Sequence, residues 1–430
     1  MEDGQQSKMT VKNLFNSSLL RSSGIYTASS LINAALPLIL MPYLTKVLSV
    51  EDYGIVAIFM LLQAFFGPFV SMNVHAAISR KFFSDDVDFS FQSYLFNGLL
   101  LILVSTVATL LVMLCFSIAL TRLTHLTTGW LVAAVISAAG QFVVTSILTV
   151  LQVKGKPMIY GAMQICLTVV NLIFTFFLIK KYNYSYSGRI LAIVYSYAFC
   201  AVVYTAWLFY RKQIKIKVEV NQLKHLLFYG APLIPHVLGG IMLGMADRLL
   251  INKLHSTYQA GIFTVALQLC SILTVILSSF NAAFIPWLFK KLKENNFEQK
   301  KQIVRFTYAG FVVIAVVGFF YALLLPNIIH LITGNKYDES VKYIIWILIG
   351  IVFNGFYILI ANYIFFAEKT YLLAISTFSC ALIYWPIALC MFKLNGVIGI
   401  PQASAISFCI LFFSTWLLSG KVYKMPWLLK

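Results

Sequence analysis

Residues 91–120 read FQSYLFNGLLLILVSTVATLLVMLCFSIAL and contain no charged side chain. About 20 consecutive apolar residues cross a bilayer as an α-helix, because only a helix satisfies its own backbone hydrogen bonds in hydrocarbon. The whole chain has this character: 60% of its 430 residues are hydrophobic, 11% are charged, and the mean hydropathy is +0.87. A water-soluble surface is incompatible with this composition. The sequence therefore predicts an all-α integral membrane protein.

Further apolar runs of similar length precede and follow this one, joined by short loops. The first begins near Ser23 with no small-residue cleavage site after it, so we expect it to remain in the protein rather than act as a removable signal peptide. In all we expect about 12 transmembrane helices, at residues 23–44, 54–77, 91–120, 129–152, 158–179, 189–210, 226–251, 260–289, 304–331, 341–366, 371–392 and 397–420.

The basic residues set the expected orientation. There are 32 Lys and Arg residues against 14 Asp and Glu residues, a formal charge of +18. Most of the basic residues fall in the segments that share a side with the N-terminus, and the positive-inside rule then places both termini in the cytoplasm. This explanation of the surplus charge requires no nucleic-acid partner. The loop that carries Lys180, Lys181 and Arg189 falls on the opposite side, and the rule does not explain it.

An internal repeat predicts how the spans are grouped. A shift of 207 residues superposes Lys46 on Lys253, Ser49 on Ser256, Gly54 on Gly261 and Ile55 on Ile262, and a shift of 208 superposes Ser71-Met72-Asn73 on Ser279-Phe280-Asn281. Six spans per copy make the copies parallel, related by a pseudo-two-fold axis along the membrane normal. We expect two six-helix bundles around a central cavity. The predicted organisation is a cytoplasmic segment 1–22, a lobe 23–210, a basic cytoplasmic linker 211–225, a second lobe 226–420 and a cytoplasmic tail 421–430.

One charged pair lies inside an expected span. Nearly all acidic residues are in loops, but Asp247 stands beside Arg248 near the end of span 226–251, with apolar residues on both sides. Charged groups within hydrocarbon are costly, which makes the pair a candidate functional site. It either faces a cavity, where it meets an anionic ligand or an exchanging cation, or forms an interfacial salt bridge to a neighbouring helix.

Other candidate residues lie at the mouths of spans or deep within them. Arg21, Arg80 and Lys81 lie at the internal mouths of the first two spans, where they either bind a pyrophosphate or act as snorkelling membrane anchors. Asn73 and Asn281 are candidate substrate contacts, although buried amides also bridge helices. Prolines interrupt helical hydrogen bonding at corresponding spans of the two halves. The predicted gate or hinge residues are Pro37, Pro42, Pro232 and Pro235.

The sequence lacks the motifs that are typical of several enzyme classes. The seven cysteines show no CxxC spacing, and the six histidines form no HExxH or HxxxH pair. A disulfide framework, a metal site and a cofactor are therefore not expected. The chain also has no phosphate-binding GxxxxGK[ST] loop, no GxGxxG after a strand and no GxSxG.

Two segments resemble a known family. Residues 42–48 and 51–55, PYLTKVL and EDYGI, are similar to the YLT+xLGxExYG segment of bacterial polysaccharide exporters. Residues 247–251 and 260–263, DRLLI and AGIF, resemble their second-half DRxxI…GIYxxA segment. His255, Thr257 and Phe263 depart from the usual residues. In length and span number the resemblance covers essentially the whole chain. It points to O-antigen flippases of the multidrug/oligosaccharidyl-lipid/polysaccharide exporter superfamily.

This resemblance implies a transporter rather than an enzyme. The expected substrate is an undecaprenyl-pyrophosphate-linked oligosaccharide repeat unit, carried from the cytoplasmic to the periplasmic leaflet of the bacterial inner membrane by alternating access, for lipopolysaccharide biosynthesis. Arg248 would bind phosphate and Asp247 would support it or couple transport to an ion. Coupling to H⁺ or Na⁺ and a polysaccharide polymerase partner stay open.

Two alternative functions remain. A drug/cation antiporter of the same superfamily would favour several acidic residues in the cavity, whereas this chain offers Asp247 alone. A membrane-embedded polysaccharide polymerase or ligase would need a large external catalytic loop, and every loop here is short.

Overall fold

The structure is a computed structural model that describes residues 28–29, 32, 36–82, 90–183, 185–293, 296–367, 369 and 371–427. Over these ranges the regular structure consists of α-helices and short 3₁₀ helices, without a β-strand. The all-α class predicted from the sequence is confirmed. The predicted segment 1–22 lies outside the described residues.

The helices follow the apolar runs closely. In the N-terminal half they are α3 (Leu36–Val47), α4 (Val50–Ser71), α5 (Val74–Phe82), α6 (Phe91–Cys115), α7 (Ser117–Thr124), α8 (Thr128–Val153), α9 (Pro157–Lys181), α10 (Tyr186–Tyr210) and α11 (Val220–Gly230). In the C-terminal half they are η1 (Ala231–Leu233), α12 (Ile234–Leu254), α13 (Thr257–Lys293), α14 (Phe297–Thr333), η2 (Gly334–Ser340), α15 (Val341–Phe366), α16 (Tyr371–Asn395), η3 (Gly396–Ile398) and α17 (Gly399–Val422).

Ten segments of the described chain are helical, long and apolar enough to cross a membrane. Two differences reconcile this number with the expected spans. The first expected span is described as a helix only from Leu36, as the shorter α3, and the last two spans form one apolar segment from Tyr371 to Val422. The chain is a multi-pass integral membrane protein.

Two expected spans are interrupted. Span 54–77 divides into α4 and α5 because Met72 and Asn73 adopt left-handed φ values of 44° and 50°. Span 226–251 divides into α11 and α12, joined through η1, which contains Pro232. Proline has no N–H to donate and clashes with the preceding turn, so it ends a regular α-helix. The predicted hinge residue Pro232 lies in this short 3₁₀ segment.

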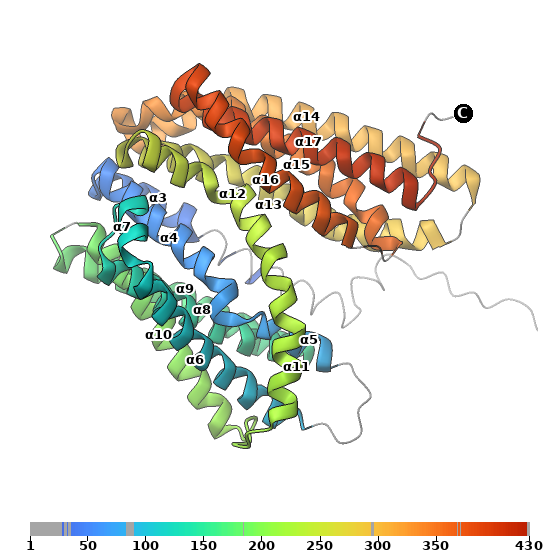
Figure 1. Ribbon diagram of the computed structural model, residues 1–430. Helices are drawn as coiled ribbons and strands as arrows, with labels where there is room; N and C mark the ends of the chain where they lie inside the picture. Colours follow the sequence, from blue (N-terminus) through green and yellow to red (C-terminus); the bar gives the residue numbers. More distant parts are fainter. Residues whose placement is uncertain are drawn as a thin grey trace, which may run out of the picture. The chain divides into compact units, whose positions relative to one another are not determined.

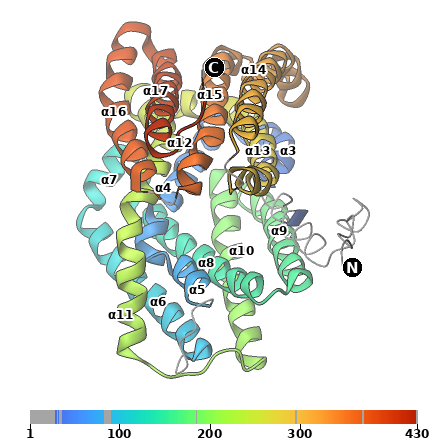
Figure 2. The ribbon, with the colours of Figure 1, turned by 90° about the vertical axis from the view of Figure 1, so that its right-hand side faces the viewer.

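The chain forms two compact units. The first contains described residues up to Leu40 together with Leu62–Ser117 and Thr128–Pro232, and the second contains Met41–Leu61, Ile118–Thr127 and the described residues from Leu233 onward. In the first unit α10 packs against both α8 and α9, while α6 packs against α8 (Figure 1). In the second, α17 packs against α15 and α16, as Figure 2 shows. The chain passes from the first unit to the second for the last time after Pro232, close to the predicted linker 211–225.

Arg189 is a structural residue of the first unit. Only 4% of its surface is exposed. Its Nη1 donates hydrogen bonds of 2.7 Å to Asn171 Oδ1 and of 2.7 Å to Thr175 Oγ1, both on α9. Arg189 therefore joins α10 to α9 from a buried position rather than lying in a solvated loop. This accounts for one of the three basic residues that the positive-inside rule left unexplained.

The internal repeat appears in the second unit as a contact between repeat-related glycines. A Cβ added to Gly54 of α4 would lie 2.2 Å from the carbonyl oxygen of Thr257, and one added to Gly261 of α13 would lie 2.2 Å from that of Val50. The 207-residue shift that relates Gly54 to Gly261 also relates Val50 to Thr257. The two contacts are therefore copies of each other, and α4 and α13 approach so closely because neither glycine has a side chain.

The residues related by the 208-residue shift do not share the same local backbone structure. Asn73 lies in the left-handed break between α4 and α5, whereas Asn281 lies within the continuous helix α13. These aligned asparagines therefore occupy different local structures.

Candidate functional site

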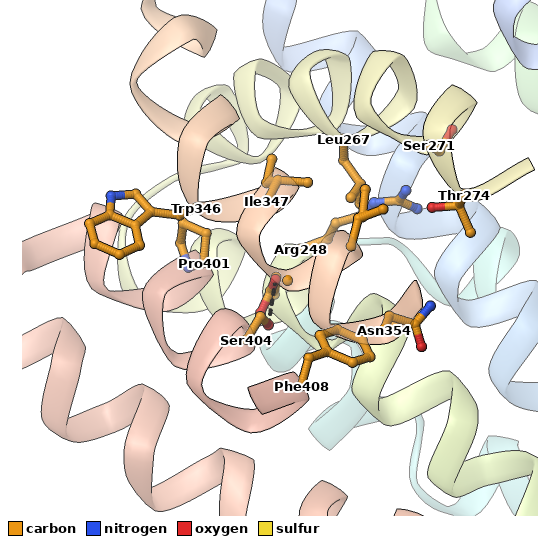
Figure 3. Close-up of a pocket in the computed structure, with 14 residues that line it drawn as sticks. Arg248, Leu267, Ser271, Thr274, Trp346, Ile347, Asn354, Pro401, Ser404 and Phe408 are labelled. Atoms are coloured by element: carbon orange, nitrogen blue, oxygen red, sulfur yellow. Dashed lines mark hydrogen bonds between the residues drawn. The ribbon is translucent and has the colours of Figure 1, made fainter. Parts of the chain in front are cut away.

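A cavity of about 260 Å³ lies inside the second unit, where α12, α13, α15 and α17 come together (Figure 3). Its polar wall comes from all four helices: Asp247, Arg248, Ser271, Thr274, Asn354 and Ser404. Apolar side chains complete it, including Trp346 and Phe408. The structure thus places the predicted charged pair on the wall of one cavity, together with hydroxyl and amide groups.

The carboxylate of Asp247 is held by hydroxyl groups of two neighbouring helices. Ser404 Oγ of α17 lies 2.7 Å from Oδ1 and 2.8 Å from Oδ2, and it donates its hydrogen bond to this carboxylate. The Tyr384 hydroxyl of α16 donates to Oδ1. Charge-assisted hydrogen bonds of this kind are about twice as strong as neutral ones. Asp247 therefore fastens α12 to α16 and α17 while still lining the cavity.

Arg248 leaves α12 in a different direction from its neighbour, because consecutive helical residues are about 100° apart around the axis. In Figure 3 its guanidinium points toward Thr274 of α13. Its Nε is buried and has no hydrogen-bond partner among the described residues. Within that part of the chain, no acidic side chain forms an ion pair with it. The carboxylate of Asp247 lines the same cavity without forming an ion pair with Arg248, so the Arg248 side chain keeps donor capacity for a ligand.

The two predicted asparagines contact other parts of the protein. Asn73 is buried, and its Nδ2 donates a 3.1 Å hydrogen bond to the carbonyl oxygen of Gly230 at the end of α11. Asn281 Oδ1 accepts a 2.7 Å hydrogen bond from Asn362 Nδ2 of α15. Neither lines the cavity. Both bridge helices in the structure, and their substrate roles remain predictions.

The predicted basic residues at the span mouths are not in the cavity either. Arg80 is exposed and Lys81 partly buried in the last turn of α5, which belongs to the first unit. Arg21 lies outside the described residues. Of the predicted phosphate-binding cations that the structure describes, only Arg248 lines the cavity.

The predicted gate prolines lie at the points where the chain changes unit. Pro37 and Pro42 lie in α3, which passes from the first to the second unit between Leu40 and Met41. Pro232 lies in η1, where the chain crosses to the second unit, and Pro235 is in the first turn of α12. Such positions suit a hinge, because proline weakens the helix that joins the units.

The hydroxyl partners of Asp247 could not be identified in the sequence. Tyr384 and Ser404 are single polar residues within apolar spans, a common pattern that does not distinguish a site from ordinary packing. Thr274 was no more visible, because only the packing of α12 and α13 brings it to the cavity that Arg248 lines. The sequence gives no sign that Ser404 contacts Asp247, because the two residues are 157 positions apart in the chain.

Comparisons with known proteins agree with this architecture. The family described as Polysaccharide biosynthesis protein matches residues 19–292, and the family MatE matches residues 232–390. Protein 1 of the Lsg locus of Haemophilus influenzae is 25% identical over 412 residues, with 94% of this chain and 99% of that protein covered. An uncharacterized membrane protein of the same organism is 26% identical over 396 residues, with 90% of this chain and 94% of that protein covered.

Solved transporter structures have the same fold. A multidrug resistance MATE family transporter of the MOP superfamily, in an inward-facing conformation, matches with a TM-score of 0.74 at 15% identity, covering 90% of this chain and 94% of that one. A MATE multidrug transporter solved as a complex matches with a TM-score of 0.67 at 15% identity, with both chains fully covered at 100%. At this level of identity the similarity establishes the fold.

Proposed function

Because the chain belongs to the Polysaccharide biosynthesis protein family, and so to the transporters of the MOP superfamily, we propose that it is a flippase for lipid-linked oligosaccharides. Its substrate is an undecaprenyl-pyrophosphate-linked repeat unit of the O-antigen type. The protein moves this unit from the cytoplasmic to the periplasmic leaflet of a bacterial inner membrane. A pyrophosphate with attached sugars cannot cross about 30 Å of hydrocarbon unaided, so the carrier must supply compensating charge.

The observation that supports this proposal most strongly is the guanidinium of Arg248, which lines the cavity and forms no ion pair among the described residues. An isolated cation within a membrane protein is costly unless a partner or a ligand neutralises it. Arg248 lines the cavity with the hydroxyls of Ser271 and Thr274, and its Nε has no partner among the described residues. The hydroxyl of Ser271 donates to the carbonyl oxygen of Gln268, which leaves the Thr274 hydroxyl beside the guanidinium. A guanidinium matches the oxygens of a phosphate group, which accept hydrogen bonds from planar, forked donors.

The size of the cavity suits the headgroup rather than the whole substrate. A cavity of about 260 Å³ is small beside a complete lipid-linked oligosaccharide, so we assign it to the pyrophosphate. The sugars would then extend beyond the cavity, with Trp346 and Phe408 offering aromatic faces to the first ring. The polyprenyl chain would stay in the lipid.

Asp247 is the proposed ion-coupling residue. Its carboxylate has hydroxyl neighbours in Tyr384 and Ser404 and no cationic partner within ion-pair distance in the described chain. Carboxylate and hydroxyl oxygens are hard ligands that accept a proton or a small cation. Because Asp247 and Arg248 are consecutive on α12, a change of charge at one shifts the helix that carries the other. Coupling to H⁺ or Na⁺ would act through this helix.

The proposed gate consists of the proline-bearing segments that join the units. Pro37 and Pro42 in α3, and Pro232 and Pro235 at η1 and the start of α12, allow these helices to bend while each unit stays intact. Bending there would open the site to one side of the membrane at a time, as alternating access requires.

A drug/cation antiporter is the second candidate. The MatE match over residues 232–390 includes Asp247 and Arg248, and the solved structures of this fold are multidrug transporters. A cationic drug would pair with Asp247 but would be repelled by Arg248. An organic anion or a phosphate ester would show the opposite preference, so the sign of the transported charge separates the two functions.

Deletion and complementation in the native host test the proposal. Loss of the gene should remove one surface glycan and leave its lipid-linked precursor on the cytoplasmic side. Wild-type protein should restore the glycan and Arg248→Ala should not, at equal membrane abundance. The matched control is Arg122→Ala, because Arg122 is an exposed residue of α7 outside the cavity. Restoration by Arg248→Ala, or a surface glycan unchanged by deletion together with lost drug export, would contradict the proposal.

A further inference from the structure

A second cavity, of about 280 Å³, lies entirely within the first unit. It forms where the turn between α8 and α9 meets the end of α10. Three cationic side chains line it: Lys154, Lys156 and Arg211. None of them belongs to the Arg248 site, and no role assigned so far uses them.

The local backbone explains why these cations converge. At the end of α8 the N–H of Lys156 donates to Leu151 O (2.9 Å), and Gly155 has a φ of +64°. The end of α10 repeats this ending, since the N–H of Gln213 donates to Leu208 O (2.9 Å) and Lys212 has a φ of 53°. Both endings satisfy the last carbonyl groups of a helix and reverse the chain.

Side-chain contacts hold the two endings together and aim the cations. The Lys154 ammonium donates to Gln213 Oε1 and lies over the Phe91 ring, 5.2 Å from its centroid. The Arg211 guanidinium lies over the Trp207 ring at 6.0 Å. Burial, and then the neighbouring charge of Lys156, lower the pKa of the Lys154 ammonium. An anion in the cavity would offset both effects by favouring the charged ammonium.

Helix dipoles account for only part of this positive charge. Each helix C-terminus carries about half a negative charge, and each N-terminus about half a positive one. The ends of α8 and α10 therefore offset about one of the three cations, while the start of α9, where Lys156 makes no side-chain cap, adds a positive end. Among the described residues no carboxylate pairs with Lys154, Lys156 or Arg211. About two and a half positive charges remain uncompensated.

The surroundings favour a lipid over a soluble anion. Val150, Leu151, Ile159 and Leu208 give the cavity an apolar floor. Beside it, Met158 is 67% and Phe209 is 41% exposed, on two helices that are long and apolar enough to cross a membrane. Exposed apolar side chains on such helices lie against acyl chains. Basic pockets between membrane helices bind anionic lipid headgroups.

We propose that this cavity binds the phosphate headgroup of an anionic phospholipid of the surrounding bilayer. Lys156 and Arg211 bind the phosphate oxygens and Lys154 forms the base of the site. Trp207 lies at the level of the headgroup, where an indole ring with an apolar body and a polar N–H is favoured. The site is separate from the transport cavity, and its test does not depend on the transported substrate.

Lipid retention by the purified full-length protein tests the assignment. Native mass spectrometry would count phosphatidylglycerol and phosphatidylcholine molecules bound to wild type, to Lys156→Gln/Arg211→Gln and to the control Lys215→Gln/Lys224→Gln. The control pair is exposed and lies outside the cavity in the same unit. Wild type and control should retain one tightly bound phosphatidylglycerol. The cavity variant should bind it about 30-fold more weakly, since each of the two removed basic residues contributes on the order of 1 kcal/mol and about 1.4 kcal/mol is a factor of ten.

Several results would overturn the proposal. Equal losses in the cavity and control variants would mean that binding reflects diffuse surface charge. Equal retention of phosphatidylglycerol and phosphatidylcholine would mean that the site does not select anions. Inorganic phosphate or pyrophosphate that displaces phosphatidylglycerol at similar concentration would identify a soluble anion as the ligand. If the double variant unfolds, the single exposed substitution Lys156→Glu should give the same loss of phosphatidylglycerol, and unchanged binding there would equally refute the site.

Discussion

Replacing either of the paired glycines with alanine should force α4 and α13 apart. The added Cβ would lie 2.2 Å from a backbone carbonyl oxygen in Gly54→Ala and also 2.2 Å in Gly261→Ala. Ordinary van der Waals contact begins at 3.4 Å, so the helices must separate by more than 1 Å at this crossing. Backbone atoms cannot rotate away as a flexible side chain can. Overpacking of this kind typically costs about 1–3 kcal/mol.

Helix propensity opposes this cost and must be included. Alanine favours a helix interior by about 1 kcal/mol over glycine. The net destabilisation we expect is therefore up to about 2 kcal/mol for each single variant. The two values should be equal, because the contacts are copies related by the repeat. The double variant should lose less than twice as much, since one separation of the helices accommodates both methyl groups.

Thermal unfolding of the purified protein in detergent measures this effect. Gly420→Ala is the matched control, because a Cβ at Gly420 in α17 would meet no atom within 4 Å. The control should unfold at or above the wild-type temperature, and both paired variants should unfold below it. Gly54→Ala or Gly261→Ala as stable as Gly420→Ala would refute the close crossing. Clearly unequal losses in the two variants would refute its symmetry.

Three further predictions follow from buried contacts. Arg189→Leu should lower the free energy of unfolding by about 2–4 kcal/mol, because Asn171 and Thr175 lose a charged donor. The control Arg122→Leu, at an exposed site, should have little effect on stability. Equal effects of the two substitutions would show that Arg189 is not a structural link. Gly230→Ala should destabilise the first unit strongly in the same unfolding assay, since its Cβ would lie 1.7 Å from Met72 O, and wild-type stability would disprove this approach. Asp247→Asn should leave transport insensitive to H⁺ and Na⁺ gradients, and Ser404→Ala should weaken the coupling without removing it; gradient-dependent transport by Asp247→Asn would exclude Asp247 as the coupling residue.

The long apolar runs of the sequence predict most of this fold, because a membrane helix must be apolar along its whole length. Residues 91–115 form α6, as the uncharged run at 91–120 predicts. The break at Pro232 agrees with the helix-disrupting effect of proline, although Pro68, Pro326 and Pro386 lie inside continuous helices. The break at Met72 and Asn73 was not predictable, because neither residue is glycine or proline and the left-handed backbone there is stabilised by a distant contact between Asn73 and Gly230.

The candidate site likewise contains residues that the sequence identifies and residues that it does not. The charges of Asp247 and Arg248 stand out in sequence because ionised groups are rare within apolar spans. Their surroundings do not, since Ser404 and Thr274 become neighbours only through helix packing. The same holds for the basic cavity, in which Lys154 meets Gln213 from 59 residues away. A single sequence identifies a costly residue more readily than the partners that compensate for it.

Transport of a defined lipid-linked glycan in proteoliposomes tests the central claim most directly. The purified protein would be reconstituted with an undecaprenyl-pyrophosphate-linked oligosaccharide, and a lectin outside the vesicles would measure its appearance in the outer leaflet. Wild type and Arg122→Ala should expose the glycan rapidly, while Arg248→Ala should expose it no faster than protein-free vesicles. Glycan exposure that is independent of the protein, in vesicles where the same protein does export a cationic dye, would contradict the claim.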